Sequence, residues 1–383
     1  MLPLDIGLNR LAEIIAVNFE MANFEFDRYK TQKKFGVKKI TFFGESALNL
    51  DFLSGYSKGR MIGRWINYAR SLADEPGSVL TPERLAIEAK SAAEKVGLKF
   101  VAKTDLAKFG GVMAVGKGSV NTPRFIILEH NGADKKEQPI ILIGKGVTYD
   151  SGGMDIKTNM LDMNMDMSGG AAVIAALAIA AKLKLKKNIV GLIPAVENMP
   201  SDKSYRPNDI IKMLSGKTVE VENTDAEGRI ILADALTYAT ENYNPRLIVD
   251  IATLTGAAMY VAGDKYSVYL TNAKKLEDIA KVIGEKSGDL MWPLPLCKDY
   301  EKELEGRFAD LSNIGKSKCG TITAALFLYQ FVKEAKVPWL HIDMAPAMLA
   351  SSGDYLAKGS AGAPIRFLVK LLEKEILPLL EVE

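Results

Sequence analysis

The chain has 383 residues, of which 48% are hydrophobic, so its length favours two or three domains and its composition can supply a sizeable core. The 49 basic and 47 acidic residues nearly balance, which argues against a general attraction to nucleic acid or to a membrane surface and favours a small partner. Only two cysteines, Cys297 and Cys319, occur, so no disulfide framework is indicated and a reducing compartment fits.

The N-terminal part of the chain predicts no targeting or membrane segment. Its first residues, MLPLDIGLNR, carry charges where a signal peptide needs an apolar core. The longest apolar run, 169–181, is shorter than the ~20 residues that cross a bilayer. We therefore expect a soluble, cytoplasmic protein. Residues 9–35 predict an amphipathic helix and a polar connection, 38–43 a strand, and 58–72 a connecting helix.

A loop at 74–82 leads to Thr81, which is expected to cap the next helix, and we place a domain boundary near Gly59. From there strands and helices alternate. Strands are expected at 99–102, 124–128, 139–143, 188–196, 247–251 and 339–342, with a hairpin-like strand at 218–221. Helices are expected at 82–96, 171–186, 229 onward, 273–286, 324–336 and 364–373. This alternation predicts a three-layer αβα domain of the α/β class, with a largely parallel sheet that binds ligands outside the carboxyl ends of its strands.

Two polar clusters follow predicted strands. The first, 144–170, supplies Lys145, Asp150, Lys157 and Asp166. The second, 221–236, reads VENTDAEGRIILADAL, where Asp225, Glu227 and Arg229 alternate just before an apolar helix. Alternate positions of an extended segment face the same side, so Asp225 and Glu227 can converge on one point. The other interpretation is that Thr224 and Asp225 only cap the helix.

The two histidines, His130 and His341, are far apart and have no partner at ligand spacing, so we expect structural roles for both. A histidine-based zinc centre or a Ser-His-Asp hydrolase is therefore poorly supplied. Any metal must be held mainly by oxygen ligands, which favours harder divalent ions or a tolerant site.

Three motifs resemble the leucyl aminopeptidase family, the cytosolic two-metal aminopeptidases: GKGVTYDSGG at 144–153, NTDAEGR at 223–229 and DIATLTGA at 250–257. The resemblance runs from about residue 59 to about 372. It implies a catalytic domain at 59–383, preceded at 1–58 by a shortened remnant of the family's N-terminal α/β domain. Thr158 and Asn208 depart from the family, which usually has proline and glycine at these positions.

The resemblance implies two divalent metal ions, zinc or manganese, with magnesium or cobalt as further options. One ion would be held by Asp150, Asp225 and Glu227, and the other by Lys145, Asp150, Asp166 and Glu227. Four carboxylates in one pocket repel each other unless cations neutralise them. Two ions can lower the pKa of a shared water, which would make a hydroxide that bridges them, and can stabilise a tetrahedral intermediate. Lys145 could ligate only as a neutral amine, which a nearby dication favours; without the motif it would be an ordinary solvated lysine.

Further roles are implied in the same way. Lys157 would polarise the scissile carbonyl and stabilise the oxyanion, and Arg229 would hold a bicarbonate ion that acts as general base; the alternative is simple salt bridging to the acidic cluster. One ion would coordinate the substrate's free α-amine. Six residues match the pocket for the first side chain: Met163, Asn223, Ala226, Thr253, Leu254 and Gly256. A pocket containing methionine suits leucine or methionine, although Met163 could also be core packing.

The function that the sequence predicts is therefore release of apolar N-terminal residues, leucine foremost, from peptides with a free N-terminus. One alternative uses the same site as a dipeptidase for substrates such as Cys-Gly. Another, of a different class, is a binding or scaffolding homologue with secondary catalysis. The resemblance also suggests a homohexamer made of two trimers. No membrane partner is expected, and the charge balance disfavours nucleic acid. The glycine-rich pieces do not have the spacing of a phosphate-binding loop.

Overall fold

A computed structural model describes residues 6–33, 36–43, 49–351 and 353–374. Within these residues nine strands form the main sheet, in the order β1-β2-β5-β3-β8-β12-β9-β10, with β4 paired to β5. The strands are β1 (Lys99–Lys103), β2 (Arg124–Asn131), β3 (Ile140–Gly144), β4 (Gly146–Asp150), β5 (Asn188–Asn198), β8 (Leu247–Ala252), β9 (Ser267–Thr271), β10 (Met291–Pro293) and β12 (Trp339–Asp343). The central strands β5, β3, β8 and β12 run parallel, whereas β1, β2 and β9 join through antiparallel pairs.

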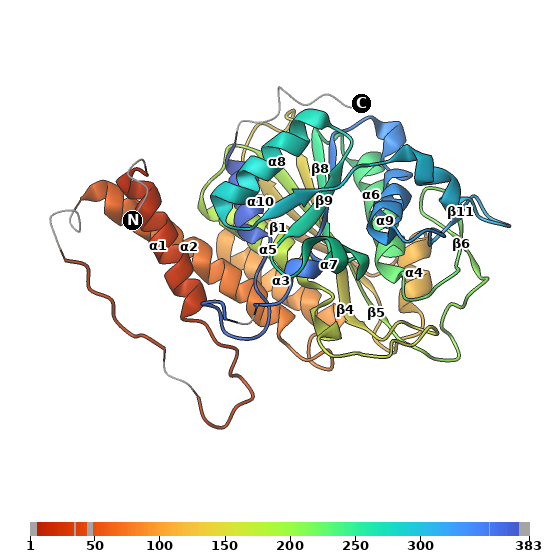
Figure 1. The fold of residues 1–383 in the computed structure, drawn as a ribbon, viewed down its shortest axis with the longest axis horizontal. Helices are drawn as coiled ribbons and strands as arrows, with labels where there is room; N and C mark the ends of the chain where they lie inside the picture. The colour runs from red at the N-terminus through yellow and green to blue at the C-terminus, as the bar shows by residue number, and fades with distance from the viewer. Residues whose placement is uncertain (1–5, 34–35, 44–48, 352, 375–383) are drawn as a thin grey trace.

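Helices cover both faces of this sheet, as Figure 1 shows. On one face lie α3 (Pro82–Val96), α5 (Ser168–Lys182), α8 (Lys274–Ser287) and α10 (Ile365–Glu373). On the other lie α4 (Gly110–Gly116), α6 (Glu227–Asn242) and α9 (Gly320–Tyr329). The short helix α7 (Ala257–Ala262) follows β8, and 3-10 turns occur at Met163–Met165, Lys298–Leu304, Lys333–Ala335 and Ala345–Ala347. The expected three-layer α/β domain with a largely parallel sheet is confirmed.

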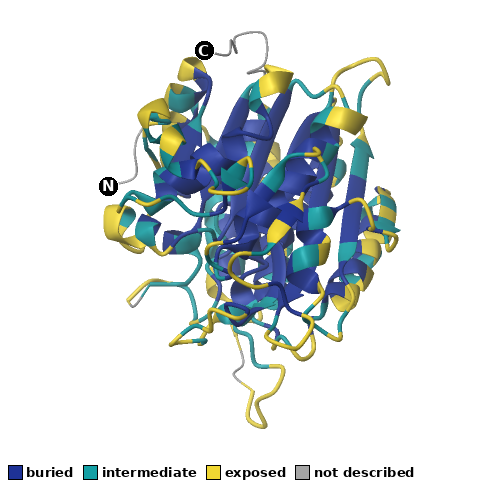
Figure 2. Cartoon of the chain, turned by 90° about the vertical axis from the view of Figure 1, so that its right-hand side faces the viewer, coloured by how far each residue is buried: buried dark blue, intermediate teal, exposed yellow. Residues whose placement is uncertain are grey.

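Successive residues of each strand point to opposite faces of the sheet, so each strand contributes side chains to two separate cores. In β3, Ile140 and Leu142 belong to the core beneath α5 and α10, whereas Ile141 and Ile143 belong to the core beneath α6 and α9. Both faces are therefore buried, as Figure 2 shows for the strands at the centre, and the strands are continuous apolar runs instead of alternating ones.

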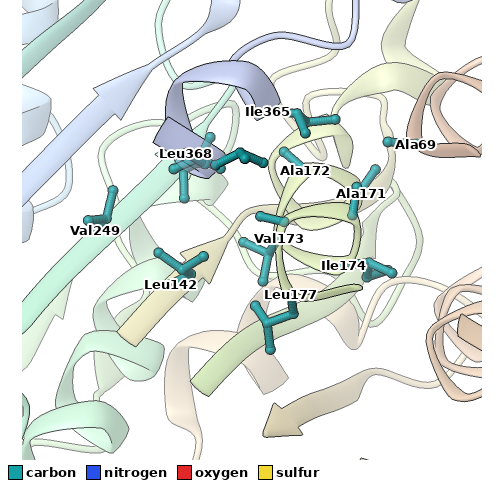
Figure 3. Packing of buried hydrophobic residues seen from close by; sticks show 14 of the residues in the cluster. Ala69, Leu142, Ala171, Ala172, Val173, Ile174, Leu177, Val249, Ile365 and Leu368 are labelled. Carbon is teal, nitrogen blue, oxygen red and sulfur yellow. The ribbon is translucent and has the colours of Figure 1, made fainter. Parts of the chain in front are cut away.

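Helix α5 lies at the centre of one core, and its residues from Ser168 to Ala180 are all buried. Figure 3 shows Val173 and Leu177 facing Leu142 of the sheet, with Leu368 of α10 beside them. A helix that is apolar on all sides needs neighbours all round it, and the sheet together with α2 (Leu50–Ala73), α3 and α10 supplies them.

The N-terminal region is a pair of helices, α1 (Leu8–Ala22) and α2, that projects from the body in Figure 1. The strand predicted at 38–43 is wrong: all six residues are described and none is in a strand. Their apolar and β-branched side chains match a strand locally, but a strand also needs a neighbour to pair with. Gly59 lies inside α2, whose C-terminal half packs in the main core. The division at 58/59 thus stays a prediction.

Most other predicted elements are present, with shifted ends. Thr81 caps α3, accepting a hydrogen bond from the Arg84 backbone N–H. The hairpin-like strand is β7 (Thr218–Glu220), which pairs antiparallel with β6 (Ile210–Lys212) and parallel with β11 (Leu311–Ser312) in a small sheet. The helix predicted at 324–336 is wrong at both ends, because α9 spans Gly320–Tyr329. None of the helices among the described residues is long and apolar enough to span a membrane.

Candidate metal centre

The carboxyl ends of five strands bring polar side chains to one edge of the sheet. Lys145 lies between β3 and β4, Asp150 ends β4, and Asn198 ends β5. Thr253 follows β8 directly, and Asp343 ends β12. Because β3, β4, β5, β8 and β12 are joined by parallel pairs, these ends meet at the same edge.

Thr224 ties the two polar clusters of the sequence together. Its hydroxyl donates to the Gly152 carbonyl at 2.6 Å, and its backbone N–H donates to Asp155 Oδ2 at 2.7 Å. Its carbonyl accepts from the Tyr205 hydroxyl at 2.6 Å and from Asn198 Nδ2 at 3.0 Å. The segment at 223–227 is thereby fixed against the loop that follows β4, so the two clusters form one site.

Helix α6 begins at Glu227, and this start differs from both sequence interpretations. Its N-cap residue is Ala226, whose side chain cannot accept a hydrogen bond, so capping by Thr224 or Asp225 is wrong. The expected extended alternation of Asp225 and Glu227 is also wrong, because Glu227 is already helical. The two carboxylates still converge, since a turn directs Asp225 back toward the first residue of the helix.

Carboxylate oxygens of Asp150, Asp225 and Glu227 lie within 4.8 Å of one another, a spacing suited to a metal ion. Asp150 is held in place by its Oδ1 atom, which accepts from the Gly152 N–H and from Asn198 Nδ2, both at 2.9 Å. Lys157 Nζ lies 2.8 Å from Asp150 Oδ2 and also forms an ion pair with Asp225. A positive charge is thus already placed between two of the three carboxylates.

Lys145 occupies the other half of the site. Its Nζ lies 2.8 Å from Asp166 Oδ1, 2.8 Å from Glu227 Oε1 and 2.9 Å from the Thr253 carbonyl oxygen. The residue is only 3% exposed, so the alternative of a solvated loop lysine is wrong. A side chain at Gly228 would meet Lys145 Nζ at 2.8 Å, so the glycine leaves the room that this lysine needs.

The electrostatics of the site favour cations. Burial, together with repulsion among the carboxylates, raises the pKa of Asp166 and of Glu227, and raises that of Asp225 to about 6. Although burial favours neutral Lys145, the Asp166 and Glu227 carboxylates outweigh it and raise the pKa of Lys145. A bound dication acts in the opposite direction on a ligating amine.

The residues present fit divalent metal ions. Four ionised carboxylates carry four negative charges and the two lysines carry two positive ones, so the cluster is short of two positive charges, or of three if Lys145 ligates as a neutral amine. Asp166 Oδ2 and Glu227 Oε2 are buried, and neither has a hydrogen-bond partner among the described residues. Buried carboxylate oxygens without partners are costly unless a cation or a donor reaches them, and oxygen ligands suit hard divalent ions.

Arg229 lies buried near Glu227 of the same cluster, and its side chain is suited to an anion. Its Nη1 atom donates to the Asn313 carbonyl at 2.9 Å, whereas its buried Nε–H has no partner within the described chain. Burial lowers the pKa of this guanidinium to about 10. An oxyanion would accept from the unpaired N–H group and offset the buried charge.

Comparison with known proteins decides the family. A model described as the catalytic domain of the cytosol aminopeptidase family matches residues 67–369. This chain belongs to the cytosol aminopeptidase family. A probable cytosol aminopeptidase of Syntrophotalea carbinolica is 40% identical, over 97% of this chain and 77% of that protein. One of Clostridium perfringens is 37% identical, over 96% of this chain and 77% of that protein.

Solved structures agree with this assignment. The bottromycin maturation enzyme BotP superposes with a TM-score of 0.85 at 32% identity, covering 94% of this chain and 78% of the other. A structure of BotP in complex with Mn gives a TM-score of 0.86 at 31% identity and the same coverage. The predicted resemblance is confirmed, and as a family member the chain is a metal-dependent aminopeptidase. The chain thus spans about three quarters of the length of these curated relatives.

The residues predicted to line the family's pocket lie around the acidic cluster. Thr253 contacts it directly, donating from its hydroxyl to Asp166 Oδ1 at 2.6 Å, and Leu254 and Gly256 follow in the same loop. Met163 begins the 3-10 turn before Asp166 and is half-buried. The remaining two, Asn223 and Ala226, flank Asp225 in the chain.

Sequence reasoning missed Asn313, which holds part of this aminopeptidase site in place. The Asn313 side chain accepts from the backbone N–H of Glu222 at 2.8 Å and donates to the Asn223 carbonyl at 2.7 Å. His341, expected to be structural, has Nδ1 2.5 Å from Asp250 Oδ1 and lies fully buried. No local sequence signal marks Asn313, because its partners are about 90 residues away. For Asp343, the only sequence signal of a place near the site was its position at the end of a predicted strand.

Asn208, where the family usually has glycine, adopts a left-handed backbone conformation with φ of 72°. Asparagine tolerates this region better than most residues. The turn before β6 is therefore formed despite the departure from the family pattern.

Proposed function

We propose that this chain removes apolar residues, leucine foremost, from the N-termini of peptides by means of two divalent metal ions. The observation that carries the proposal is the convergence of four carboxylates and two lysines, from two loops distant in sequence, at the carboxyl edge of the sheet. That edge is where α/β domains bind their ligands.

In this proposal Asp150, Asp225 and Glu227 hold one ion, and Lys145 with Asp166 holds the other, sharing Asp150 and Glu227. When bound, the two ions supply a water of lowered pKa and positive charge for the developing oxyanion. Manganese is a good candidate, because a solved structure of the relative BotP contains it and because the donors are mostly oxygens. Zinc is the other candidate.

The remaining roles fall to side chains that ligate no metal. Lys157 is 19% exposed and lies close to the carboxylates. Burial alone would lower its pKa, but the negative charges of Asp150 and Glu227 outweigh burial and raise it, so the ammonium stays charged. It would polarise the scissile carbonyl and stabilise the oxyanion. Arg229 would hold bicarbonate as general base, using its unpaired N–H group. The half-buried Met163 and the loop at 253–256 would accept the first side chain.

The deciding experiment measures metal content and leucyl-substrate hydrolysis for the wild type and for Asp225→Ala. Removing one carboxylate from a three-carboxylate group should lower the bound metal and reduce the rate by at least about 100-fold. Asp202→Ala serves as a matched control, because Asp202 is exposed on the neighbouring loop and should change neither quantity. The proposal fails if the wild type, supplied with manganese or zinc, hydrolyses no free-amine substrate.

Substrate length is tested with the same preparation. Rates on leucyl-anilide, on dipeptides including Cys-Gly and on longer peptides should favour apolar first residues irrespective of length. A rate confined to dipeptides would replace this proposal with the dipeptidase alternative.

A further inference from the structure

Asp343 is a buried carboxylate that no ligand role claims. It ends β12, is 0% exposed, and accepts three hydrogen bonds. Its Oδ1 atom accepts from the backbone N–H of Leu254 at 3.1 Å and of Ala345 at 3.2 Å, and its Oδ2 atom accepts from the Thr255 hydroxyl at 2.6 Å. Three donors on one carboxylate favour its ionised form, although burial raises the pKa of Asp343 overall.

The loop that Asp343 holds, residues 253–255, reaches the candidate metal ligands from its other side. The Thr253 carbonyl accepts from Lys145 Nζ at 2.9 Å, and the Thr253 hydroxyl donates to Asp166 Oδ1 at 2.6 Å. Lys145 and Asp166 are two of the groups assigned to one of the two ions. One residue of the loop therefore orients two ligands, and the next two residues are fixed by Asp343.

The hydrogen-bond directions make this arrangement specific. A carboxylate only accepts, so the Thr255 hydroxyl must donate to Asp343. The Thr321 hydroxyl, 2.8 Å from Thr255 Oγ1, must then donate to Thr255, and the Ala258 N–H donates to the same oxygen at 3.2 Å. The loop is thus anchored to β12, to α9 and to the start of α7 through one threonine hydroxyl.

We propose that Asp343 is a positioning residue for the half of the metal centre formed by Lys145 and Asp166: through Leu254 and Thr255 it fixes the loop from which Thr253 orients both ligands. The inference rests on the proposed two-metal function. Groups that orient metal ligands from outside commonly change metal affinity or activity by about 10–100-fold.

The test uses two pairs of variants. Asp343→Asn replaces one acceptor oxygen with an amide donor, and Asp234→Asn is its control. Asp234 is also 0% exposed and accepts two backbone N–H groups, from Val112 and Leu214, but it holds α4 and the turn after β6. Thr255→Val removes the hydroxyl at nearly constant shape, and Thr255→Ser restores it.

Three quantities are measured: manganese content after dialysis, kcat and KM for a leucyl substrate, and amide hydrogen exchange at residues 253–258 in the metal-free protein. We expect Asp343→Asn and Thr255→Val to retain about one ion per chain, to lose about 10–100-fold in kcat with a smaller change in KM, and to exchange faster at 253–258. Thr255→Ser should approach the wild type. Asp234→Asn should lower the unfolding midpoint and leave metal content and kcat unchanged.

The proposal is overturned if Asp343→Asn and Thr255→Val keep two ions and wild-type kcat, or if Asp234→Asn loses metal to the same degree. Should Asp343→Asn fail to fold, the Thr255 pair decides. A wild type without aminopeptidase activity would count against the proposed function instead, whereas the exchange measurement on metal-free protein still reports on the loop.

Discussion

At Lys157 the ion-pair and oxyanion interpretations make different predictions. If the ammonium only neutralises Asp150 and Asp225, bound metal makes it dispensable. If it stabilises the oxyanion, Lys157→Met should lower kcat by about 100–1000-fold, the usual effect of removing one such donor. KM and metal content should change little, because all four carboxylates remain. Steady-state kinetics with metal analysis checks this, with the exposed Lys203→Met as control. A variant that keeps its kcat, or that loses metal, contradicts the oxyanion role.

Asp74 should make stability depend on pH. Burial raises the pKa of Asp74 from 3.8 to about 6. The Ser360 N–H group and Arg70 offset this rise only in part, and Asp74 Oδ2 has no hydrogen-bond partner in the described part of the chain. Since the folded-state pKa exceeds the unfolded one, the free energy of unfolding falls as pH rises from about 4 to about 6, by at most about 3 kcal/mol, and stays low above that range.

Asp74→Asn removes this titration while keeping one acceptor for the Ser360 N–H. The variant should therefore gain stability relative to wild type as pH rises through that window. Urea unfolding at pH 4 and pH 7.5 measures the difference, with Asp202→Asn as an exposed control. Equal differences at the two pH values would show that Asp74 does not titrate in this range.

The sequence could predict those site residues that a motif or a strand end marks. Lys145, Asp150 and Asp225 are of this kind, and the structure brings all three into one cluster. The sequence could not predict the contacts of Asn313 or the hydrogen bond from the Leu254 N–H to Asp343, because these contacts join positions 84 to 91 residues apart. Only the packing of the layers brings such residues together.

Elements were predictable where local pattern and tertiary environment agree. Helix α3 matches its prediction at both ends, because Thr81 and Gly97 mark them with a cap and a left-handed turn. Helix α9 was misplaced because its first residues, Gly320 to Thr323, are poor helix formers. There, buried Thr321 lies 2.8 Å from the Thr255 hydroxyl, a contact across 66 residues of sequence. Tertiary contacts of this kind outweigh helix propensity.

The packing of α1 on α2 depends on glycine spacing. Gly55, Gly59 and Gly63 lie four residues apart, and a side chain at Gly59 would meet the Glu13 carbonyl oxygen at 2.3 Å and Ala16 Cβ at 2.8 Å. Backbone cannot yield as a flexible side chain can, so Gly59→Leu should separate the two helices at a cost of about 1–3 kcal/mol.

Hydrogen exchange should then rise in residues 8–22, whereas metal content and activity stay near wild type, because the candidate ligands lie in other elements. Ser57→Leu, on the exposed side of α2, is the control and should leave exchange in α1 unchanged. Unaltered protection of α1 in Gly59→Leu would mean that the close approach is not required.

For the whole molecule, the alternation of strands and helices was enough to predict a three-layer domain, since parallel strands need crossover helices on both faces. The strand order was not predictable. It places β5 and β8 on either side of β3 and adds β4 beside β5, so that residues from 145 to 343 share one edge. The site is thus a property of the sheet's topology more than of any one motif.

The hexamer stays a prediction, and α7 offers a way to test it. Met259, Tyr260 and Val261 are all exposed there, Tyr260 by 95%. Clustered apolar side chains on a surface usually mark an interface, where aromatic residues are enriched. In a closed symmetric assembly one changed residue alters every copy of its interface. Tyr260→Glu should therefore reduce the molar mass in solution from six chains of 41.8 kDa to a smaller species.

Light scattering coupled to size exclusion measures this mass. Val120→Glu is the matched control, because Val120 is as exposed, at 96%, but lies in the bend between α4 and β2. That variant should elute as the wild type does. A monomeric wild type would contradict the hexamer. A hexameric Tyr260→Glu would place the interface elsewhere on the chain.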